Sequence, residues 1–354
     1  MNLPLVRLSQ QKVITNHFSN PQVAVGYMGA IQAQDFEMSK WAIGLRTSQS
    51  TNGTIMDALD NGSLVRTHVL RPTWHIVSGQ DVRWMMALTG KNIKAISATY
   101  ARGLGIDATL YNQANDLIIR ALEGGKNLTR KEIMSEIEKG GIKMDSSRAV
   151  IFMMNAETDA IVCNGTMKGK EQTYALLDEK VPKGVIMSRE EALATLAQRY
   201  FSSHAPTTIQ DFQWWSGLSM TDARAGLQSI MNELDEVEIG GRKYFYSKNI
   251  EYLPSGKSVL LLPAFDEYCV SYKDRSEIFD PQWHKQAITN NGIFKPIVVI
   301  NGKVEGIWKR TIQKKQVLIE PTFFSPQIKV DIDKLNYAAQ QFGDFVGLPV
   351  EVKM

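Results

Sequence analysis

The sequence is poor in the residues that build disulfide frameworks and metal centres. It contains two cysteines, Cys163 and Cys269, and five histidines in 354 residues. The two cysteines lie far apart and have no spacing typical of a zinc site. We therefore expect no disulfide framework, no metal and no cofactor.

Long apolar runs are also absent. No segment approaches the roughly 18 consecutive apolar residues that a membrane-spanning helix needs. The opening stretch, MNLPLVRLSQQKVITNHF, has no apolar region of the kind found in a signal peptide. We therefore expect a cytoplasmic protein with no membrane partner. Hydrophobic residues make up 44% of the chain and charged residues 22%, which argues against extended disorder.

Neither sign of charge dominates, because the chain has 40 basic and 37 acidic side chains, which give a net charge of +3. The distribution is uneven: residues 1–105 contain ten Lys or Arg and five Asp or Glu. A mildly basic front third would suit contact with phosphates. Solvated helix faces are the alternative, and charge alone favours that alternative.

The middle of the chain follows a recognisable order of elements. Residues 111–125 predict an amphipathic helix that ends at a glycine pair. Thr129 and Glu132 have the spacing of a capping box at the start of a second helix, and a third begins at Ser146 or Ser147. Two strand-like runs around the turn-rich NGTMKGKE follow. Three helices and a hairpin are the order of a winged helix.

The same order recurs on both sides. Downstream, residues 188–233 predict three helices, and a hairpin follows with Gly240-Gly241 at its tip. Upstream, residues 21–46 predict a long helix, with a break near Gln32 as an open alternative, and residues 63–77 predict a hairpin. From about residue 254 strands dominate, with an Asn-Gly hairpin at 301–302 and a terminal helix over 332–347.

These patterns predict an α+β fold with tandem winged-helix units (helix-turn-helix plus β-hairpin) and a small C-terminal β-barrel-like module. The expected boundaries are 1–105, 106–184 and 185–252 for the three winged-helix units and 253–354 for the β-rich module with its terminal helix. Three such units in one chain favour duplex DNA, or a protein partner, over a small-molecule substrate.

Two amides stand two residues apart in GAIQAQDFEMSKWAIGLR, at Gln32 and Gln34. In an unbroken helix they would not share a face, so they converge only from an extended or interrupted stretch. An amide is no general base at neutral pH, but it can accept from water and donate to an anion at once, and so orient that water. Solvent-facing helix amides are the alternative, and spacing alone favours it.

A second stretch, RTHVLRPTWHIV, is rich in basic, hydroxyl and aromatic side chains. Strand alternation predicts Arg71, Thr73 and His75 on one face and Trp74 on the other. Such a strand could bind phosphates and stack on a displaced base. An ordinary amphipathic strand with Trp74 in the core explains the pattern equally well.

Five segments across the chain resemble the AlkZ/YcaQ-like winged-helix DNA glycosylases of bacteria: QAQD, RTHVLRPTWHIV, DFQWWSGLSMTDAR, LLPAFDEYCVSYKDR and NGIFKPIVVINGKVEGIWKR. The resemblance implies excision of alkylated purines, especially N7-alkylguanine, and unhooking of interstrand crosslinks without a metal. The AlkZ-like branch carries Gln-x-Gln, matched by Gln32 and Gln34, where the YcaQ-like branch has Gln-x-Asp. Thr73 and His75 match the family's Thr-x-His element, which implies a place beside the lesion.

The implied mechanism is water placement. N7 alkylation makes guanine cationic and hence a good leaving group, so Gln32 and Gln34 need only hold water against C1′. Asp35 is a weaker candidate, as a base. The expected partner is double-stranded DNA with alkylated bases or crosslinks, bound by a monomer that is nucleoid-associated when on DNA. The candidate DNA contacts are Arg66, His68, Arg71, Lys303 and Lys309, the last two near a 301–302 hairpin expected to insert into a groove.

The alternative is a winged-helix DNA-binding protein without catalysis, either a transcriptional regulator or a repair scaffold. Recognition helices at 146–157 and 219–233 should then carry several basic or polar side chains, but they offer little beyond Arg148 and Arg224. The pair Trp214-Trp215 is expected in the core. The acidic and basic residues of LPAFDEYCVSYKDR are expected mainly to form ion pairs that hold the fold, with a smaller expectation that Tyr272, Lys273 or Arg275 touches DNA.

Overall fold

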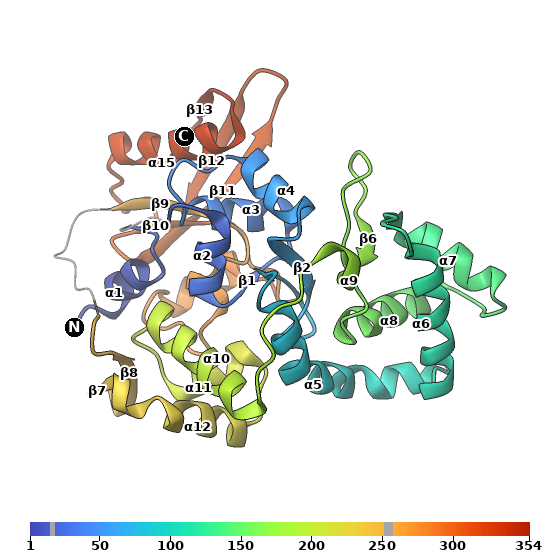
Figure 1. The fold of residues 1–354 in the computed structure, drawn as a ribbon. Coiled ribbons are helices and arrows are strands. Elements are labelled where there is room, and N and C mark those ends of the chain that lie inside the picture. The colour runs from blue at the N-terminus through green and yellow to red at the C-terminus, as the bar shows by residue number, and fades with distance from the viewer. Residues whose placement is uncertain (15–17, 251–257) are drawn as a thin grey trace. The chain divides into compact units, whose positions relative to one another are not determined.

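The computed structural model describes residues 1–14, 18–250 and 258–354. These residues form two compact units, and Figure 1 labels most of their elements. The first unit consists of Met1–Ile55, Ala194–Trp215 and Ser219–Met354, and the second of Met56–Leu193 with Ser216–Leu218. Helices and strands mix in both units, which confirms the α+β class. The four modules expected from the sequence stay a prediction.

A five-stranded sheet near the C-terminus is the main β element of the first unit. Its order is β13-β12-β11-β10-β9, antiparallel throughout except for the parallel pair β12 and β13. The strands are β9 (Val259–Leu262), β10 (Ile297–Ile300), β11 (Lys303–Ile312), β12 (Val317–Phe323) and β13 (Val350–Val352). The strands that the sequence predicts in the C-terminal region therefore form a sheet. The sequence did not predict that β13 pairs with β12.

The terminal helix α15 (Ile332–Val346) packs on this sheet (Figure 1). Its apolar residues recur at helical spacing, and the ring of Phe342 contacts Trp41 at 5.3 Å and Trp308 at 5.4 Å between centroids. The helix ends where Gly347 adopts φ 74°, a left-handed conformation that suits glycine.

The other elements of the first unit are mostly short. They are α1 (Leu3–Gln10), α2 (Pro21–Met28), β1 (Ile31–Gln32), α3 (Phe36–Gly44), α12 (Met220–Ser229), η1 (Met231–Glu233), β7 (Leu234–Ile239), β8 (Arg242–Ser247), α13 (Glu267–Val270), η2 (Pro281–Trp283) and α14 (His284–Ala287). Three further helices contribute residues to both units: α4 (Asn52–Asp60), α10 (Arg189–Ser203) and α11 (Ile209–Ser216).

The second unit contains two hairpins and a group of helices. Its elements are β2 (Leu64–His68), β3 (Trp74–Ser78), α5 (Val82–Gly103), α6 (Ala108–Leu122), β4 (Leu128–Thr129), α7 (Arg130–Lys139), α8 (Ser146–Thr158), β5 (Val162–Asn164), β6 (Thr173–Leu176) and α9 (Leu177–Lys180). Strands β4, β6 and β5 form a sheet in that order. The core of this region is built from apolar residues of α6, α7 and α8, including Ile118, Ile133 and Phe152.

Local signals in the sequence were good guides to helix and hairpin ends. The capping box of Thr129 and Glu132 is present at the start of α7. The hairpins at 63–77, 240–241 and 301–302 all form. One cap was assigned wrongly: Asp145, rather than Ser146 or Ser147, caps α8, because its carboxylate accepts from the Ser147 and Arg148 N–H groups.

The long helix predicted over 21–46 is wrong, whereas the alternative of a break near Gln32 is confirmed. Helix α2 ends at Gly29, which has φ 80°, and α3 begins after Asp35, whose carboxylate accepts the Met38 N–H. At Gly29 an added Cβ would lie 3.1 Å from the Trp215 ring, so the close approach as well as the backbone favours glycine.

Candidate functional site

Gln32 and Gln34 lie in the short non-helical stretch between α2 and α3. Gln32 ends β1 and is 6% exposed, whereas Gln34 follows it and is exposed. Gln34 lies in the bend that follows β1, outside the strand. The break therefore removes the helical geometry that would have directed the two amides to different faces.

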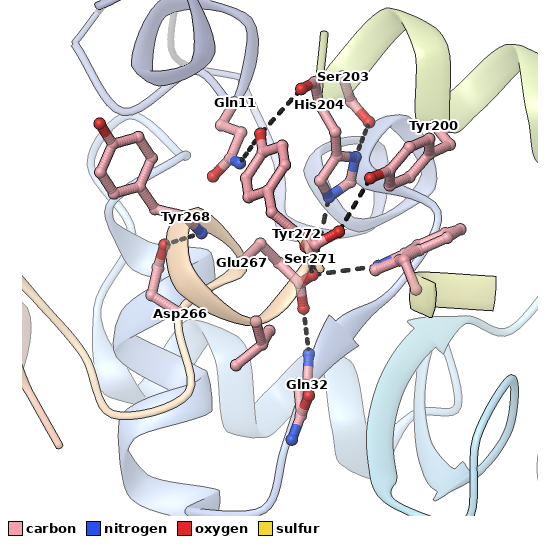
Figure 2. A network of polar contacts seen from close by, with 12 residues as sticks. Gln11, Gln32, Tyr200, Ser203, His204, Asp266, Glu267, Tyr268, Ser271 and Tyr272 are labelled. Carbon is pink, nitrogen blue, oxygen red and sulfur yellow. Dashed lines mark hydrogen bonds and ion pairs between the residues drawn. The ribbon is translucent and has the colours of Figure 1, made fainter. Parts of the chain in front are cut away.

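A buried carboxylate holds the backbone at this break. Figure 2 shows Glu267, from α13, meeting Gln32 through the main chain of Gln32. The Gln32 N–H donates to Glu267 Oε1 at 2.6 Å. The indole Nε1 of Trp215 donates to Oε2 at 3.1 Å, and the Ser271 hydroxyl also donates to Oε2. Glu267 itself is 0% exposed, so these donors replace the water that the carboxylate has lost.

Glu267 is an anion in this setting. Burial by itself raises the pKa of its carboxyl, but the nearby imidazole of His204 and the hydrogen bonds from Ser271 and Gln32 outweigh that effect and lower the pKa to about 2. His204 Nε2 lies 3.7 Å from Glu267 Oε2, longer than an ordinary hydrogen bond. Burial also lowers the pKa of His204, against the opposing effect of Glu267.

Asp35, the weaker candidate for a base, has a structural task. Its Oδ1 accepts the Met38 N–H at 3.0 Å as the N-cap of α3. Arg310 Nη2 lies 4.0 Å from the same oxygen. An aspartate side chain at this position is suited to capping a helix N-terminus.

The second candidate stretch forms the β2–β3 hairpin of the second unit. Thr67 pairs with His75 and His68 with Trp74. His75 is 0% exposed, and its Nδ1 lies 2.9 Å from the Thr73 carbonyl oxygen. The predicted alternation of Arg71, Thr73 and His75 on one strand face is wrong, because β3 begins at Trp74 and both earlier residues lie in the turn.

The hydroxyl of Thr73 is a buried polar group that is still available. Among the residues that the structure describes, its Oγ1 has no hydrogen-bond partner. Buried hydroxyls are normally satisfied because leaving one unpaired costs free energy. This atom is therefore suited to contact a bound molecule.

Arg66 and Trp74 line a pocket of about 440 Å³ in the second unit. The Arg66 guanidinium lies 4.0 Å from the centroid of the Trp74 ring and donates to the Gln172 side chain. The remaining lining residues are Thr129, Arg130, Lys131, Glu171 and Tyr174. Three cations beside two aromatic rings give the pocket the chemistry that binds phosphates and stacks on bases.

His68 and the two lysines have different surroundings. His68 Nδ1 contacts the buried carboxylate of Glu157, and its ring lies tilted against that of Trp74, with 4.4 Å between ring centroids. Lys309 is exposed on β11, while Lys303 donates to the carbonyl oxygen of Glu277.

The expectation that the 301–302 hairpin inserts into a groove is wrong. Gly302 is buried, and an added Cβ there would lie 2.7 Å from Pro4 Cβ. Its carbonyl oxygen also accepts from the Tyr268 hydroxyl at 2.6 Å. The turn packs against α1 within the first unit, so it does not project as a free hairpin that could insert into a DNA groove.

Sequence reasoning missed the part that Glu267 plays beside Gln32. It placed Glu267 among ion pairs that hold the fold, a description that does fit Asp266, which is buried against Arg46 at 3.0 Å. It also placed both tryptophans in the core; Trp215 is fully buried, but Trp214 is 41% exposed. The signal available was the carboxylate pair in AFDEYC, because two adjacent acids at a buried strand end need partners from elsewhere in the chain.

The candidate residues thus fall into two groups. Gln32, Gln34 and Asp35 belong to the first unit, with Lys303 and Lys309. The second unit contains Arg66, His68, Arg71, Thr73 and His75.

Within residues 1–14, 18–250 and 258–354, no helix is long and apolar enough to cross a membrane.

Comparison with known proteins gives a consistent result. The model of a family described as DNA glycosylase AlkZ-like matches residues 25–345. An interstrand DNA cross-link repair glycosylase of Streptomyces sahachiroi is 22% identical over 312 residues, covering 84% of this chain and 83% of that protein. The solved structure of Streptomyces sahachiroi DNA glycosylase AlkZ superposes with a TM-score of 0.83 at 19% identity, covering 99% of this chain and 98% of that one. Since the family model spans most of its length, the chain belongs to the AlkZ-like DNA glycosylase family.

Proposed function

We propose that this DNA glycosylase hydrolyses the N-glycosidic bond of alkylated purines of the N7-alkylguanine type, using Gln32 and Gln34 to hold the attacking water. The observation that carries the proposal is the extended break at Gln32, which a buried carboxylate fixes through the main chain. An amide there can accept from a water proton while it donates elsewhere, and so orient the water oxygen. Positioning is the main contribution expected.

The chemistry of the lesion explains why two amides suffice. A purine alkylated at N7 is cationic and leaves as a neutral base, so little general acid catalysis is required. The water loses its proton to the bulk solvent as it bonds to C1′, and the electron pair of the glycosidic bond leaves with the base. A cationic sugar in the transition state is stabilised by nearby negative charge and oriented dipoles.

We further propose that interstrand crosslinks are among the substrates. The relative from Streptomyces sahachiroi is named as a cross-link repair glycosylase, and the likeness to it covers 84% of this chain. A crosslink between two N7 atoms presents the same cationic leaving group as a monoadduct. The same hydrolysis would therefore release one strand.

Thr73 and His75 are proposed to lie beside the lesion. The proposed contacts with the DNA backbone are Arg66, His68, Arg71, Lys303 and Lys309. The buried, unpaired Thr73 hydroxyl supports a contact with substrate, and the cationic pocket at Arg66 supports contact with phosphates. If His75 faces the lesion, His75→Ala should reduce excision more than binding. A loss of binding alone would identify it as a backbone contact.

We infer that the architecture is tandem winged helices with a C-terminal β-barrel-like module. The order α6, β4, α7, α8, β5, β6, with β6 central in its sheet, supports this for the middle of the chain. Most of α8, the helix in the recognition position, is buried. A helix packed in this way presents few side chains to base edges, which disfavours the alternative of a sequence-specific regulator. We expect a monomer, associated with the nucleoid when bound to DNA.

The test is the release of 7-methylguanine from duplex DNA by the wild type, Gln32→Ala and Gln34→Ala. Losing one positioning group should slow excision on the order of 10²- to 10³-fold, by analogy with oxyanion donors. Circular dichroism checks that both variants fold. Wild-type rates in both variants would overturn the assignment of the glutamines. If the wild type itself released no base, the alternative of a DNA-binding protein without catalysis would be favoured.

A further inference from the structure

The main chain at Gln32 depends on contacts outside its own segment. Strand β1 is two residues long, between the end of α2 at Gly29 and the cap of α3 at Asp35. A two-residue strand has too few ladder hydrogen bonds to fix its own position. The direction of the Gln32 side chain is therefore set by the partners of its backbone.

Glu267 supplies one such partner from 235 residues away in the sequence. The 2.6 Å bond from the Gln32 N–H ends on a carboxylate oxygen, and hydrogen bonds to a charged acceptor are short and strong. The opposite oxygen is held by Trp215 and Ser271. Both oxygens are thus restrained, and Figure 2 shows the Gln32 side-chain amide at the far end of the residue from Glu267.

The elements that carry Glu267 are themselves well fixed. Asp266, the N-cap of α13, accepts the Tyr268 N–H at 2.9 Å and forms a buried ion pair with Arg46. Both groups of that pair are 0% exposed. The start of α13 is therefore tied to Arg46, which follows the end of α3 and donates to the Ala42 carbonyl oxygen of that helix, and Glu267 is a rigid reference point for Gln32.

We propose that Glu267 is a positioning residue for base excision: it anchors the main chain of Gln32 so that the side-chain amide holds the water. This rests on the proposed role of Gln32 in hydrolysis. Glu267 touches neither water nor DNA in this scheme and moves no proton. It acts through the peptide of Gln32.

Glu267→Gln is the direct test, because glutamine keeps the shape but offers one acceptor oxygen where the carboxylate offers two. Three donors then compete for that oxygen, and an amide N–H₂ faces at least one of them. We expect the single-turnover rate on a duplex with one 7-methylguanine to fall on the order of 10- to 100-fold at saturating enzyme, with the DNA Kd unchanged. An unchanged rate would overturn the proposal.

A double-mutant cycle separates positioning from general damage to the fold. If Glu267 acts through the Gln32 side chain, Glu267→Gln should add less than about threefold to the loss already caused by Gln32→Ala. Full multiplication of the two losses would show that Glu267 acts by another route and would overturn the inference. Wild-type activity in Gln32→Ala would instead refute the proposed function itself, so the two failures are distinguishable.

Asp211→Asn is the matched control. Asp211 is another buried carboxylate of the first unit, and it accepts from the Thr208 N–H at 3.0 Å and the Lys273 N–H at 2.8 Å. We expect this variant to lose stability. Its single-turnover excision rate at saturating enzyme should stay within about threefold of the wild-type rate, because a change at a remote site has only a small effect on excision. If it slows excision as much as Glu267→Gln, the effect of Glu267 is structural and the proposal fails. Should Glu267→Gln not fold, Glu267→Asp gives the same readout, since its shorter side chain cannot reach both Gln32 and Ser271.

Discussion

At the scale of single residues, His204 shows how burial sets protonation. Its ring stacks on Tyr200, with 4.7 Å between centroids, and lies 5.3 Å from the Trp215 ring. The Ser203 hydroxyl donates to the Arg199 carbonyl, so Ser203 Oγ accepts from His204 Nδ1 at 2.7 Å. This hydrogen bond places a proton on Nδ1, and burial lowers the pKa of His204 against the opposing effect of Glu267.

Stability should therefore fall as the pH falls below about 6.5, the ordinary pKa of histidine. Because burial lowers the pKa of His204 in the folded protein, the unfolded chain binds more protons in this range, and the free energy of unfolding decreases. One such group contributes at most about 1.4 kcal/mol per pH unit. Glu267, with a pKa of about 2, acts in the same direction below its ordinary value of 4.5.

Urea unfolding between pH 7.5 and 5.5 measures this effect. The wild type should lose stability more steeply with falling pH than His204→Gln, which lacks the titrating group. Identical pH dependence in the two proteins would mean that His204 does not carry the effect.

At the scale of elements, the start of α7 depends on a reciprocal pair of hydrogen bonds. The Glu132 N–H donates to Thr129 Oγ1 at 3.3 Å, and the Thr129 N–H donates to Glu132 Oε2 at 2.6 Å. These bonds satisfy donors that the first turn of a helix leaves open. The same turn presents Arg130 and Lys131 to the pocket at Arg66.

Thr129→Ala should lower the free energy of unfolding by about 1 kcal/mol, within the range for N-cap loss. Thr109→Ala is the control, because it makes the same chemical change at an exposed position within α6. Chemical denaturation of both variants compares the two sites. Equal stability changes would contradict a capping role for Thr129.

Elements with a local cause could be predicted from the sequence. The Gly-Gly and Asn-Gly turns and the Thr-x-x-Glu cap act over four residues or fewer, so the residues that cause them are neighbours in the chain. Predictions failed where distant packing decided the outcome. The turn at Gly302 contacts α1, and Trp214 turns outward while its neighbour Trp215 is buried beside Gly29.

At the scale of the whole molecule, DNA binding has to come from local concentrations of charge. The 40 basic and 37 acidic residues nearly cancel, so the net charge of +3 offers little attraction to DNA. The pocket lined by Arg66, Arg130 and Lys131 is one place where cations outnumber acids. Binding there should release counterions from the DNA backbone.

The affinity for duplex DNA should therefore weaken as salt rises, with a slope of about −0.9 in log–log form for each neutralised phosphate. Arg130→Ala and Lys131→Ala should each reduce the magnitude of the slope by about 1. Lys353→Ala, at an exposed lysine near the C-terminus, is the control and should leave the slope unchanged. A slope that no variant alters would remove the pocket from the DNA interface.

The sequence by itself determined the family resemblance, the hairpins and the capping box at Thr129, and it left the break near Gln32 as an alternative to a continuous helix. Each of these depends on residue types at short spacing, which a single chain displays directly. Only the tertiary structure decided what holds the break in place. Glu267 reaches Gln32 across 235 residues of sequence, and a contact between such distant residues follows from packing rather than from any local pattern.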